Sequence, residues 1–362
     1  MAVIWEPALS EEARGCRDLA DRLTREHFAP LAAELDRDQR YPSENVHRLV
    51  EHELAGLFIP KRFGGAGASL RATAAVVETI ARGCPSTAAI LCTYQLGAFP
   101  VLLAGRDDQK QHYLGEMARG VATSFALSER HAGSDAAAIQ TTARRDGDRW
   151  HLRGEKYWIG NGGASRYYVV FAKSAADGSA ADRGARGISA FLVDKDQSGV
   201  VIDELADKMG LRGTQTSNLR LDVTVPDSAR IGEVNGGLRL ALQTLDVGRV
   251  LVAAQSTGLA LAAYREAAQR AVERHAFGGP IIENQGIGFR LADSAVGRAP
   301  DALRSRKRVR PRPRYRDTRR HGQTLRVRSS ASSSRLRRAS LGRTGILQAD
   351  RRGTALPRSA RP

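Results

Sequence analysis

The sequence predicts an α+β fold in which a small antiparallel β domain lies between two helical regions. Three observations indicate this fold. Apolar residues recur at helical spacing through about the first 120 residues, short β-branched or aromatic runs bounded by Gly, Asp and Pro follow, and helical spacing then returns. These changes divide the chain into an N-terminal helical domain (1–121), a middle β domain (122–234), a truncated C-terminal helical domain (235–297) and an Arg-rich tail (298–362).

The first region is predicted to be helical because its apolar positions follow capping residues. Ser10 is expected to cap the first helix, since a serine hydroxyl accepts from a free backbone N–H and the dipole favours Glu11 and Glu12 in the first turn. Ser43 is expected to open a second helix, and the glycine cluster at residues 64–67 interrupts the pattern. Further helices are expected at residues 70–82, 87–103 and 107–119.

The middle region carries strand and turn signals. Asp146 and Gly147 form a strong hairpin turn signal between runs at residues 139–144 and 149–153. Further strands are expected at residues 167–173, 187–193 and 219–225, with a mobile loop rich in small residues at 175–186. Short strands with such boundaries predict a small sheet or barrel that ends near Pro226.

Helical spacing returns at residues 238–275, where the pattern ends at Gly278, Gly279 and Pro280. Another helix is expected to begin near Asn284, and its pattern is lost after Ala295. The residues that follow combine few large apolar side chains with many charges, which predicts a disordered tail.

The net charge of +17 belongs to that tail. Residues 298–362 hold 20 Arg and 1 Lys against 3 Asp, so the first 297 residues are close to neutral, at −1. A nucleic-acid-binding arm of the usual kind interleaves aromatic and basic residues, and the tail offers only Tyr315. We therefore expect no specific nucleic-acid partner.

Two further features concern the compartment. No run of 18 apolar residues is found, so no membrane span is expected, and the N-terminus lacks the pattern of a signal peptide. The three cysteines (Cys16, Cys84 and Cys92) are odd in number and far apart, which favours a reducing, cytoplasmic location over a disulfide framework.

One polar loop stands out where helices give way to strands. Residues 126–135 read Ala-Leu-Ser-Glu-Arg-His-Ala-Gly-Ser-Asp, and hydroxyls and backbone N–H groups in such a loop suit an extended polar ligand. A solvated loop is the alternative. Similarly, the glycines at residues 64–67 and 160–163 fit tight turns at least as well as ligand-binding loops. The first cluster follows helix-like sequence and not a strand, so it lacks the context of a dinucleotide fingerprint.

Together with other motifs, this loop resembles the acyl-CoA dehydrogenase family. The supporting motifs occur in the family's order over residues 10–297: Ile-Pro-Lys-Arg-Phe-Gly-Gly-Ala-Gly at 59–67, Trp-Ile-Gly-Asn-Gly-Gly at 158–163, Asp-Lys-Met-Gly-Leu-Arg at 207–212, Asp-Val-Thr-Val-Pro at 222–226, Asp-Val-Gly-Arg at 246–249, and Arg-His-Ala-Phe-Gly at 274–278 with Asn284 and Gln285. The order of helical, β and helical regions is also that of the family.

The resemblance implies an FAD-dependent oxidoreductase that acts on the CH–CH bond of a fatty acyl-CoA in β-oxidation. A base would remove the proton beside the thioester carbonyl, and the flavin would take the hydride from the next carbon. The implied cofactor-binding residues are Phe125, Ala126, Leu127, Ser128, Gly133, Ser134, Trp158, Ile159 and Gly160, with Arg274, Phe277 and Gln285 reaching the FAD of a neighbouring subunit. Ser134, Asp246 and Arg249 would meet the acyl-CoA. A homo-oligomer (dimer or tetramer) and electron-transfer flavoprotein as acceptor are implied as well.

Two positions depart from the family pattern. The family commonly has Thr or Ser where Gly160 stands, which supplies a hydroxyl near the flavin N5. The catalytic glutamate is absent from both of its known positions, because nothing like its Tyr-Glu-Gly-Thr segment follows residue 297 and the alternative position is Gly248. Glu129 is the acid nearest the flavin loop in sequence, and a family-like fold would point it away from the acyl chain. No residue is therefore assigned as catalytic.

These departures leave three hypotheses of function. The chain is an acyl-CoA dehydrogenase with impaired activity, a non-catalytic FAD or CoA-ester binding protein, or a protein that binds nucleic acid through its tail. A frameshift near residues 296–298 of a GC-rich gene would produce such a tail, and a genuine basic extension is the alternative.

Overall fold

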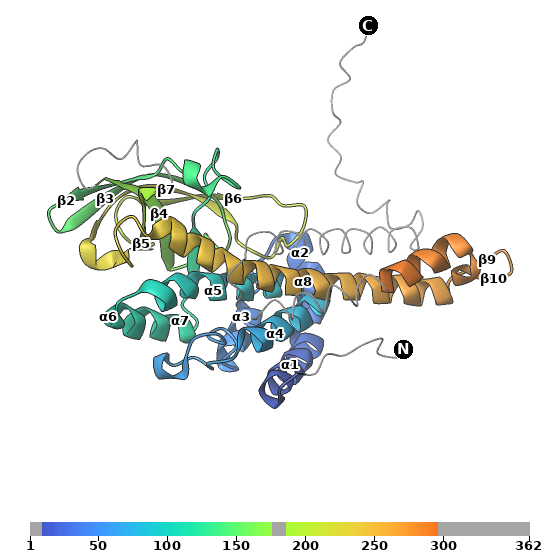
Figure 1. Ribbon diagram of the computed structural model, residues 1–362. Helices are drawn as coiled ribbons and strands as arrows, with labels where there is room; N and C mark the ends of the chain where they lie inside the picture. The colour runs from blue at the N-terminus through green and yellow to red at the C-terminus, as the bar shows by residue number, and fades with distance from the viewer. Residues whose placement is uncertain (1–8, 176–185, 296–362) are drawn as a thin grey trace, which may run out of the picture.

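The computed structural model describes residues 9–175 and 186–295. Helices at the N-terminal end, a β sheet and one long helix that runs past both form its main parts (Figure 1). The order of helical, β and helical regions is therefore confirmed. The expected mobile loop at 175–186 lies, except for its two ends, outside the described residues, as does the whole of the Arg-rich tail.

The N-terminal region consists of helices with two π-helical turns between them. The Ser10 hydroxyl accepts from the Ala13 N–H at 3.3 Å, so the expected cap is confirmed. The elements are α1 (Glu11–Leu23), a π turn (Thr24–Phe28), α2 (Ala29–Asp38), α3 (Ser43–Glu51), α4 (Leu70–Gly83), α5 (Pro85–Ala104), α6 (Asp107–Gln109), a second π turn (Lys110–Leu114) and α7 (Gly115–Ala118).

The middle region forms one sheet with strand order β6-β7-β3-β2-β4-β5-β8, and β1 pairs with β4 off this path. The hairpin predicted at Asp146 and Gly147 is confirmed, with Gly147 in the left-handed conformation that the turn requires. The strands are β1 (Thr123–Ala126), β2 (Thr142–Asp146), β3 (Arg149–Ile159), β4 (Tyr167–Ala175), β5 (Ile188–Asp194), β6 (Val200–Leu205), β7 (Ser217–Pro226) and β8 (Arg230–Ile231).

The sheet departs from the expected antiparallel arrangement at two places. Both β1 and β2 pair with β4 in parallel. The connections that lead from each of them to β4 cross over, so that β4 runs in the same direction as its partner. The edge strand β6 was also not predicted. Its residues do not alternate cleanly, since Val201 and Leu205 are exposed apolar side chains.

The long helix α8 (Gly237–Glu273) has 37 residues, packs against α4 and α5, and extends beyond them (Figure 1). A helix of this length spans about 55 Å. It is followed by a two-stranded hairpin of β9 (His275–Ala276) and β10 (Gly279–Pro280) and by a helix over residues 285–295. The hairpin lies at the end of α8 that is far from the sheet.

The apolar core has separate parts on the two faces of the sheet. Alternate residues of β4 enter different clusters, because side chains in a strand point to opposite faces: Val169 and Phe171 pack toward the helices, whereas Tyr168 and Val170 pack with Trp150 inside the β domain. Burial on both faces fixes the register of β4, and β4 is the strand next to which β1 delivers the polar loop.

Helix α5 bears on the expectation that the chain has no membrane span. Its 18-residue window has a mean hydropathy of 1.6 and makes it the one helix in the described residues that is long and apolar enough to cross a membrane. However, 67% of that window is buried. Because the helix packs against α4, α8 and β1, its place in the core accounts for its apolar character.

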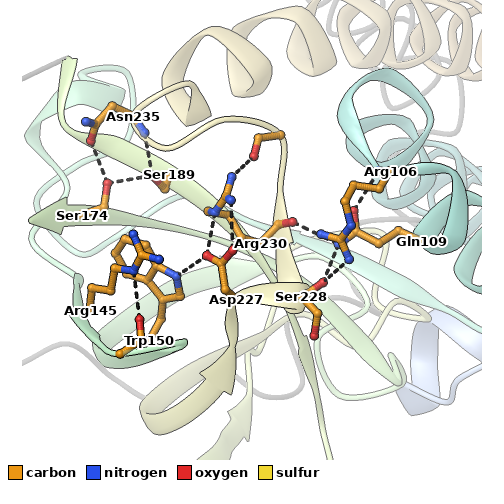
Figure 2. A network of polar contacts seen from close by, with 12 residues as sticks. Arg106, Gln109, Arg145, Trp150, Ser174, Ser189, Asp227, Ser228, Arg230 and Asn235 are labelled. Carbon is orange, nitrogen blue, oxygen red and sulfur yellow. Dashed lines mark hydrogen bonds and ion pairs between the residues drawn. The ribbon is translucent and has the colours of Figure 1, made fainter. Parts of the chain in front are cut away.

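A polar network joins the helical region to the sheet (Figure 2). The Gln109 side-chain amide donates to the carbonyl oxygens of Ser228 and Arg230, at 2.8 and 3.0 Å. In the turn before β8, Asp227 accepts from the Trp150 indole at 2.7 Å and pairs with the Arg230 guanidinium at 3.0 Å. The network therefore joins α6 to this turn.

A second group in the same view fixes the start of α8. The Asn235 N–H donates to the Ser189 hydroxyl at 2.8 Å, and the Ser174 hydroxyl donates to the Asn235 side-chain oxygen at 2.8 Å (Figure 2). Asn235 is left-handed (φ 67°), a conformation that Asn tolerates better than most residues. These bonds hold the chain on β4 and β5 just before the helix begins.

The Asp227 cluster makes a testable contribution to stability. Hydrogen bonds from Arg230 and then Trp150 lower the pKa of Asp227 to about 2 from an ordinary 3.8. Because the folded-state pKa lies below the unfolded value, the stabilisation is complete above about pH 4 and is lost as the pH falls toward 2. We expect Asp227→Asn to cost about 1 kcal/mol at neutral pH, since the carboxylate is partly exposed, and to flatten the acid limb of the stability profile.

Urea unfolding of Asp227→Asn and of the unmodified chain between pH 2 and pH 7 measures this effect. The control is Asp203→Asn, which removes an ion pair with Arg220 that lies within the sheet. An Asp227→Asn variant with the unmodified acid dependence would show that this cluster contributes no charge-dependent stability.

Candidate functional site

The centre of the candidate site is a β-bulge near the end of β3. Lys156 pairs with Leu219 of β7 and Ile159 pairs with Ser217, so Tyr157 and Trp158 together face the single residue Asn218. Trp158 is left-handed (φ 55°), and its N–H donates to the Asn218 side-chain oxygen at 3.0 Å. The bulge turns the Trp158 indole outward, and 63% of that residue is exposed.

The polar loop lies beside this bulge. The freed Tyr157 N–H donates to the Ser128 carbonyl at 2.9 Å, which joins the loop directly to β3. Upstream, Phe125 packs on Phe171 with ring centroids 4.9 Å apart, and Ala126 and Leu127 are buried. The loop therefore has a fixed, apolar base.

The outer part of the loop is open. Ser128 is half-buried, and Gly133 and Ser134 are exposed. A Cβ atom added at Gly133 would meet nothing within 4 Å. Hydroxyls and backbone N–H groups at these positions are consequently accessible to a ligand that lies against Trp158.

The turn after Trp158 is held from two other elements. The Ser124 hydroxyl of β1 donates to the Gly160 carbonyl at 2.7 Å and contacts the Ser165 hydroxyl at 2.7 Å. Ile159 is buried, and the Asn161 side-chain amide donates to the Ile90 carbonyl of α5 at 3.4 Å. The backbone at residues 158–161 thus has one defined position against β1 and α5.

The position of Gly160 has room for a side chain. A Cβ there would meet the Thr93 hydroxyl oxygen of α5 at 3.4 Å and the Thr93 methyl carbon at 4.0 Å, which are ordinary contacts. A β-carbon would therefore fit at this position without displacing a neighbour.

The α8 part of the site carries an ion pair next to a glycine. Arg249 and Asp246 pair one turn apart, with the Arg249 Nη1 and Asp246 Oδ1 atoms at 2.9 Å. Burial raises the pKa of Asp246 above its ordinary value even though Arg249 opposes the shift. A Cβ at Gly248 would come within 2.8 Å of the Leu96 Cδ1 atom, so this position faces α5.

The structure does not place Arg274, Phe277 and Gln285 near the part of α8 that carries Asp246 and Arg249 in the same chain. All three are exposed and lie at or beyond the far end of α8, with Phe277 left-handed (φ 57°) in the hairpin. The 28 residues of helix between Asp246 and Arg274 correspond to about 40 Å. The residues near Asp246 and those near Arg274 of one chain are therefore too far apart to contact the same flavin ring.

Sequence reasoning missed the buried pair of Lys156 and Glu129. The Lys156 Nζ atom lies 2.7 Å from Glu129 Oε1, and both residues are buried. Alternation along β3 could have identified Lys156, because Trp150, Leu152 and Lys156 share the inward face. Glu129 also accepts from the Gln140 and Thr141 N–H groups just before β2, so its carboxylate is fully engaged within the β domain.

The described residues fit a flavin but show no metal site. The exposed Trp158 indole offers a flat aromatic surface, and the open backbone at Gly133 leaves room for the anionic part of a dinucleotide. Within residues 9–175 and 186–295 no group of three or more His, Cys, Asp or Glu side chains could hold a metal ion.

Comparison with known proteins defines the class first through its domains. The family model described as acyl-CoA dehydrogenase, N-terminal domain, matches residues 10–121, that of the middle domain matches residues 124–224, and that of the C-terminal domain matches residues 235–300. These three domains occur in the order that the structure has. The chain belongs to the acyl-CoA dehydrogenase family.

Individual relatives agree with this assignment. The chain is 39% identical over 284 residues to the mitochondrial short-chain specific acyl-CoA dehydrogenase of Rattus norvegicus, covering 78% of this chain and 67% of the relative. It is 40% identical over 287 residues to the 3-(aryl)acrylate reductase of Clostridium sporogenes, covering 78% and 75%. The butyryl-CoA dehydrogenase structure from Megasphaera elsdenii superposes with a TM-score of 0.87 at 29% identity, covering 94% of this chain and 90% of that one.

Proposed function

We propose that this chain is an FAD-dependent acyl-CoA dehydrogenase that removes hydrogen from the Cα–Cβ bond of a fatty acyl thioester, and that the chain as written does so poorly. The observation that carries the proposal is the joined loop and bulge, in which the Ser128 carbonyl accepts from Tyr157 and Trp158 is presented outward. The second part of the proposal rests on Gly248, which has no side chain to act as base.

The residues of this chain would divide the work as follows. The loop at Phe125–Ala126–Leu127–Ser128, with Gly133 and Ser134, binds the flavin on one side, and Trp158, Ile159 and Gly160 pack on the other. Bound FAD supplies the hydride acceptor. Asp246 and Arg249, fixed by their 2.9 Å ion pair, orient the CoA portion together with Ser134.

Proton removal is the step that this chain lacks the means to assist. The carbon beside a thioester carbonyl needs a carboxylate within hydrogen-bond reach, and such general-base catalysis is worth about 10²–10⁴-fold. Glu129 is held by Lys156 and two backbone N–H groups inside the sheet, so it does not replace the missing group.

A second copy of the chain would complete the flavin site. Arg274 lies about 40 Å along α8 from Asp246, and Phe277 and Gln285 follow it in the chain, so these three residues would reach the FAD of a neighbouring subunit in a dimer or tetramer. Electron-transfer flavoprotein is the acceptor we propose; a structure of the electron transferring flavoprotein of Acidaminococcus fermentans matches this chain with a TM-score of 0.88 at 29% identity. Participation in β-oxidation and a cytoplasmic location, consistent with three free cysteines, complete the proposal.

The flavin part of the proposal predicts weak but specific binding. We expect the purified chain to bind FAD, because the loop and the bulge are intact. We expect it to lose FAD on gel filtration, because residues 298–362 do not resemble the last helices of the family. Flavin fluorescence titration and absorbance of the eluted protein measure this. Stoichiometric FAD that survives gel filtration would mean that the last helices of the family contribute little to affinity.

The catalytic part is tested by anaerobic addition of acyl-CoAs of several chain lengths to the FAD-loaded chain. We expect slow bleaching of the flavin absorbance. Rapid bleaching would show that another residue serves as the base and would contradict the impaired activity.

A non-catalytic FAD or CoA-ester binding protein is the second candidate, and Gly248 is the residue that favours it. Acyl-CoA would then perturb the flavin spectrum without bleaching it at any chain length. The source DNA, read in the other two frames past codon 297, tests the proposed frameshift, because a Glu-Gly-Thr-like segment in one of them would supply the missing base.

A further inference from the structure

The ammonium group of Lys156 lies entirely inside the β domain and has three partners. Its Nζ atom donates to the Leu127 carbonyl at 3.2 Å, to the Phe171 carbonyl at 2.6 Å and to Glu129 Oε1 at 2.7 Å. These partners belong to the polar loop and to β4. One side chain from β3 therefore bonds to two other segments of the candidate site.

Glu129 extends the same connection to a fourth segment. Its carboxylate accepts from the Gln140 and Thr141 N–H groups just before β2, in addition to Lys156. Burial acts to raise the pKa of Glu129, but the charge of Lys156 and the hydrogen bonds outweigh it and hold the pKa below its ordinary value. Burial lowers the pKa of Lys156 to about 8, so both groups are charged at neutral pH.

The place of this pair in the chain separates it from an ordinary buried ion pair. Lys156 is the last residue of β3 in register before the bulge, and Tyr157 and Trp158 follow it immediately. Leu127 and Glu129 flank Ser128, whose carbonyl accepts from the Tyr157 N–H. The pair thus bonds on both sides of the one backbone contact that joins the loop to the bulge.

We propose that Lys156 and Glu129 are positioning residues that hold the Leu127–Ser128 loop against the β3 bulge, so that the two surfaces that receive the flavin keep one relative geometry. This inference rests on the proposed flavin site. A pair that served only to stabilise the fold would affect unfolding and would leave the geometry of this contact unchanged.

The test uses the full chain and a variant in which no buried charge is left alone. Lys156→Met combined with Glu129→Gln removes both charges. The Gln140 and Thr141 N–H groups bond to different oxygens of Glu129, so the glutamine oxygen accepts from one of them, and the Leu127 and Phe171 carbonyls lose their donor. Removing both partners avoids the large destabilisation that follows when one buried charge loses its counterpart. The matched control is Leu152→Ala, a cavity on the same face of β3, in an apolar cluster that does not include Leu127.

The first readout needs no cofactor. Deuterium exchange of the Tyr157 amide reports the contact with Ser128 directly, because exchange requires that this bond open. After correction for each variant's change in global stability, we expect the Tyr157 amide of the double variant to exchange at least about tenfold faster than in the unmodified chain. In Leu152→Ala we expect its protection to be unchanged. Equal effects in the two variants would overturn the positioning role.

The second readout is flavin affinity and the visible absorbance spectrum of bound FAD. We expect the double variant to bind FAD about tenfold more weakly than Leu152→Ala, which corresponds to about 1.4 kcal/mol of binding free energy, with a shifted flavin spectrum. An unchanged affinity and spectrum in the double variant would also overturn the inference. If the unmodified chain bound no FAD, the proposed function would fail, and the exchange measurement would still decide whether the pair holds the loop.

Discussion

Gly248→Glu is expected to raise the rate of flavin reduction by an acyl-CoA about 10²–10⁴-fold over that of the unmodified chain. The substitution places a carboxylate one residue before Arg249, on the helix that also carries Asp246. The backbone is already helical there, so a residue with a side chain is tolerated and removes the entropic cost of a helical glycine. The measurement is anaerobic bleaching of FAD in the loaded variant.

Leu96 decides how well the new side chain fits. Its Cδ1 atom would lie 2.8 Å from the added Cβ, which is too close, but it is the end of a flexible side chain that can rotate away. Gly248→Glu combined with Leu96→Ala is therefore the second form to examine. Gly248→Gln is the control, since it has the same shape and no basic carboxylate. Equal rates for the Glu and Gln variants would show that position 248 does not reach the acidic carbon.

Gly258→Val is expected to be the most destabilising of the single substitutions considered for the helical region. A Cβ at this position of α8 would lie 2.1 Å from the Glu78 carbonyl oxygen of α4 and 2.9 Å from the Ala81 Cβ atom. The nearest obstacle is backbone, so the two helices must separate. We expect a loss of about 1–3 kcal/mol or more, seen as a melting temperature lower by several degrees.

Circular dichroism during heating and urea unfolding measure this loss. Gly15→Ala is the control, because a Cβ atom added at this position of α1 meets nothing within 4 Å and should stabilise the chain by about 0.5–1 kcal/mol. A Gly258→Val variant as stable as the unmodified chain would mean that α4 and α8 are not closely packed in solution.

Much of the fold could be predicted because its signals are local. The Ser10 cap, the turn at Asp146 and Gly147 and the helix that became α8 each depend on residues that are neighbours in sequence. Strand β6 and the parallel pairings of β4 could not be predicted in this way. They depend on partners from distant segments, and an edge strand with exposed Val201 and Leu205 has no clear alternation.

In the candidate site, too, the local motifs could be predicted and the contacts between distant segments could not. The polar loop and the Trp158 segment were identified from motifs, but their contact through Ser128 and Tyr157 was not, because it exists only once β3 has a bulge. The bulge in turn needs Asn218, 60 residues further along the chain. Lys156 was overlooked because a lysine within a strand is usually on the exposed face.

The order in which the chain leaves the ribosome gives the bulge a consequence for folding. The loop is synthesised before β4, with which β1 pairs at Thr123 and Tyr167, and long before Ser217 and Asn218 of β7. The bulge at Tyr157 and Trp158 exists only when β3 is paired with β7, and such distant pairing must first close a long loop. The bulge therefore forms only after β7 has emerged. A nascent chain stalled before residue 217 would contain every residue of the loop but would lack the bulge that presents Trp158. It would also expose the apolar base of the loop to chaperones.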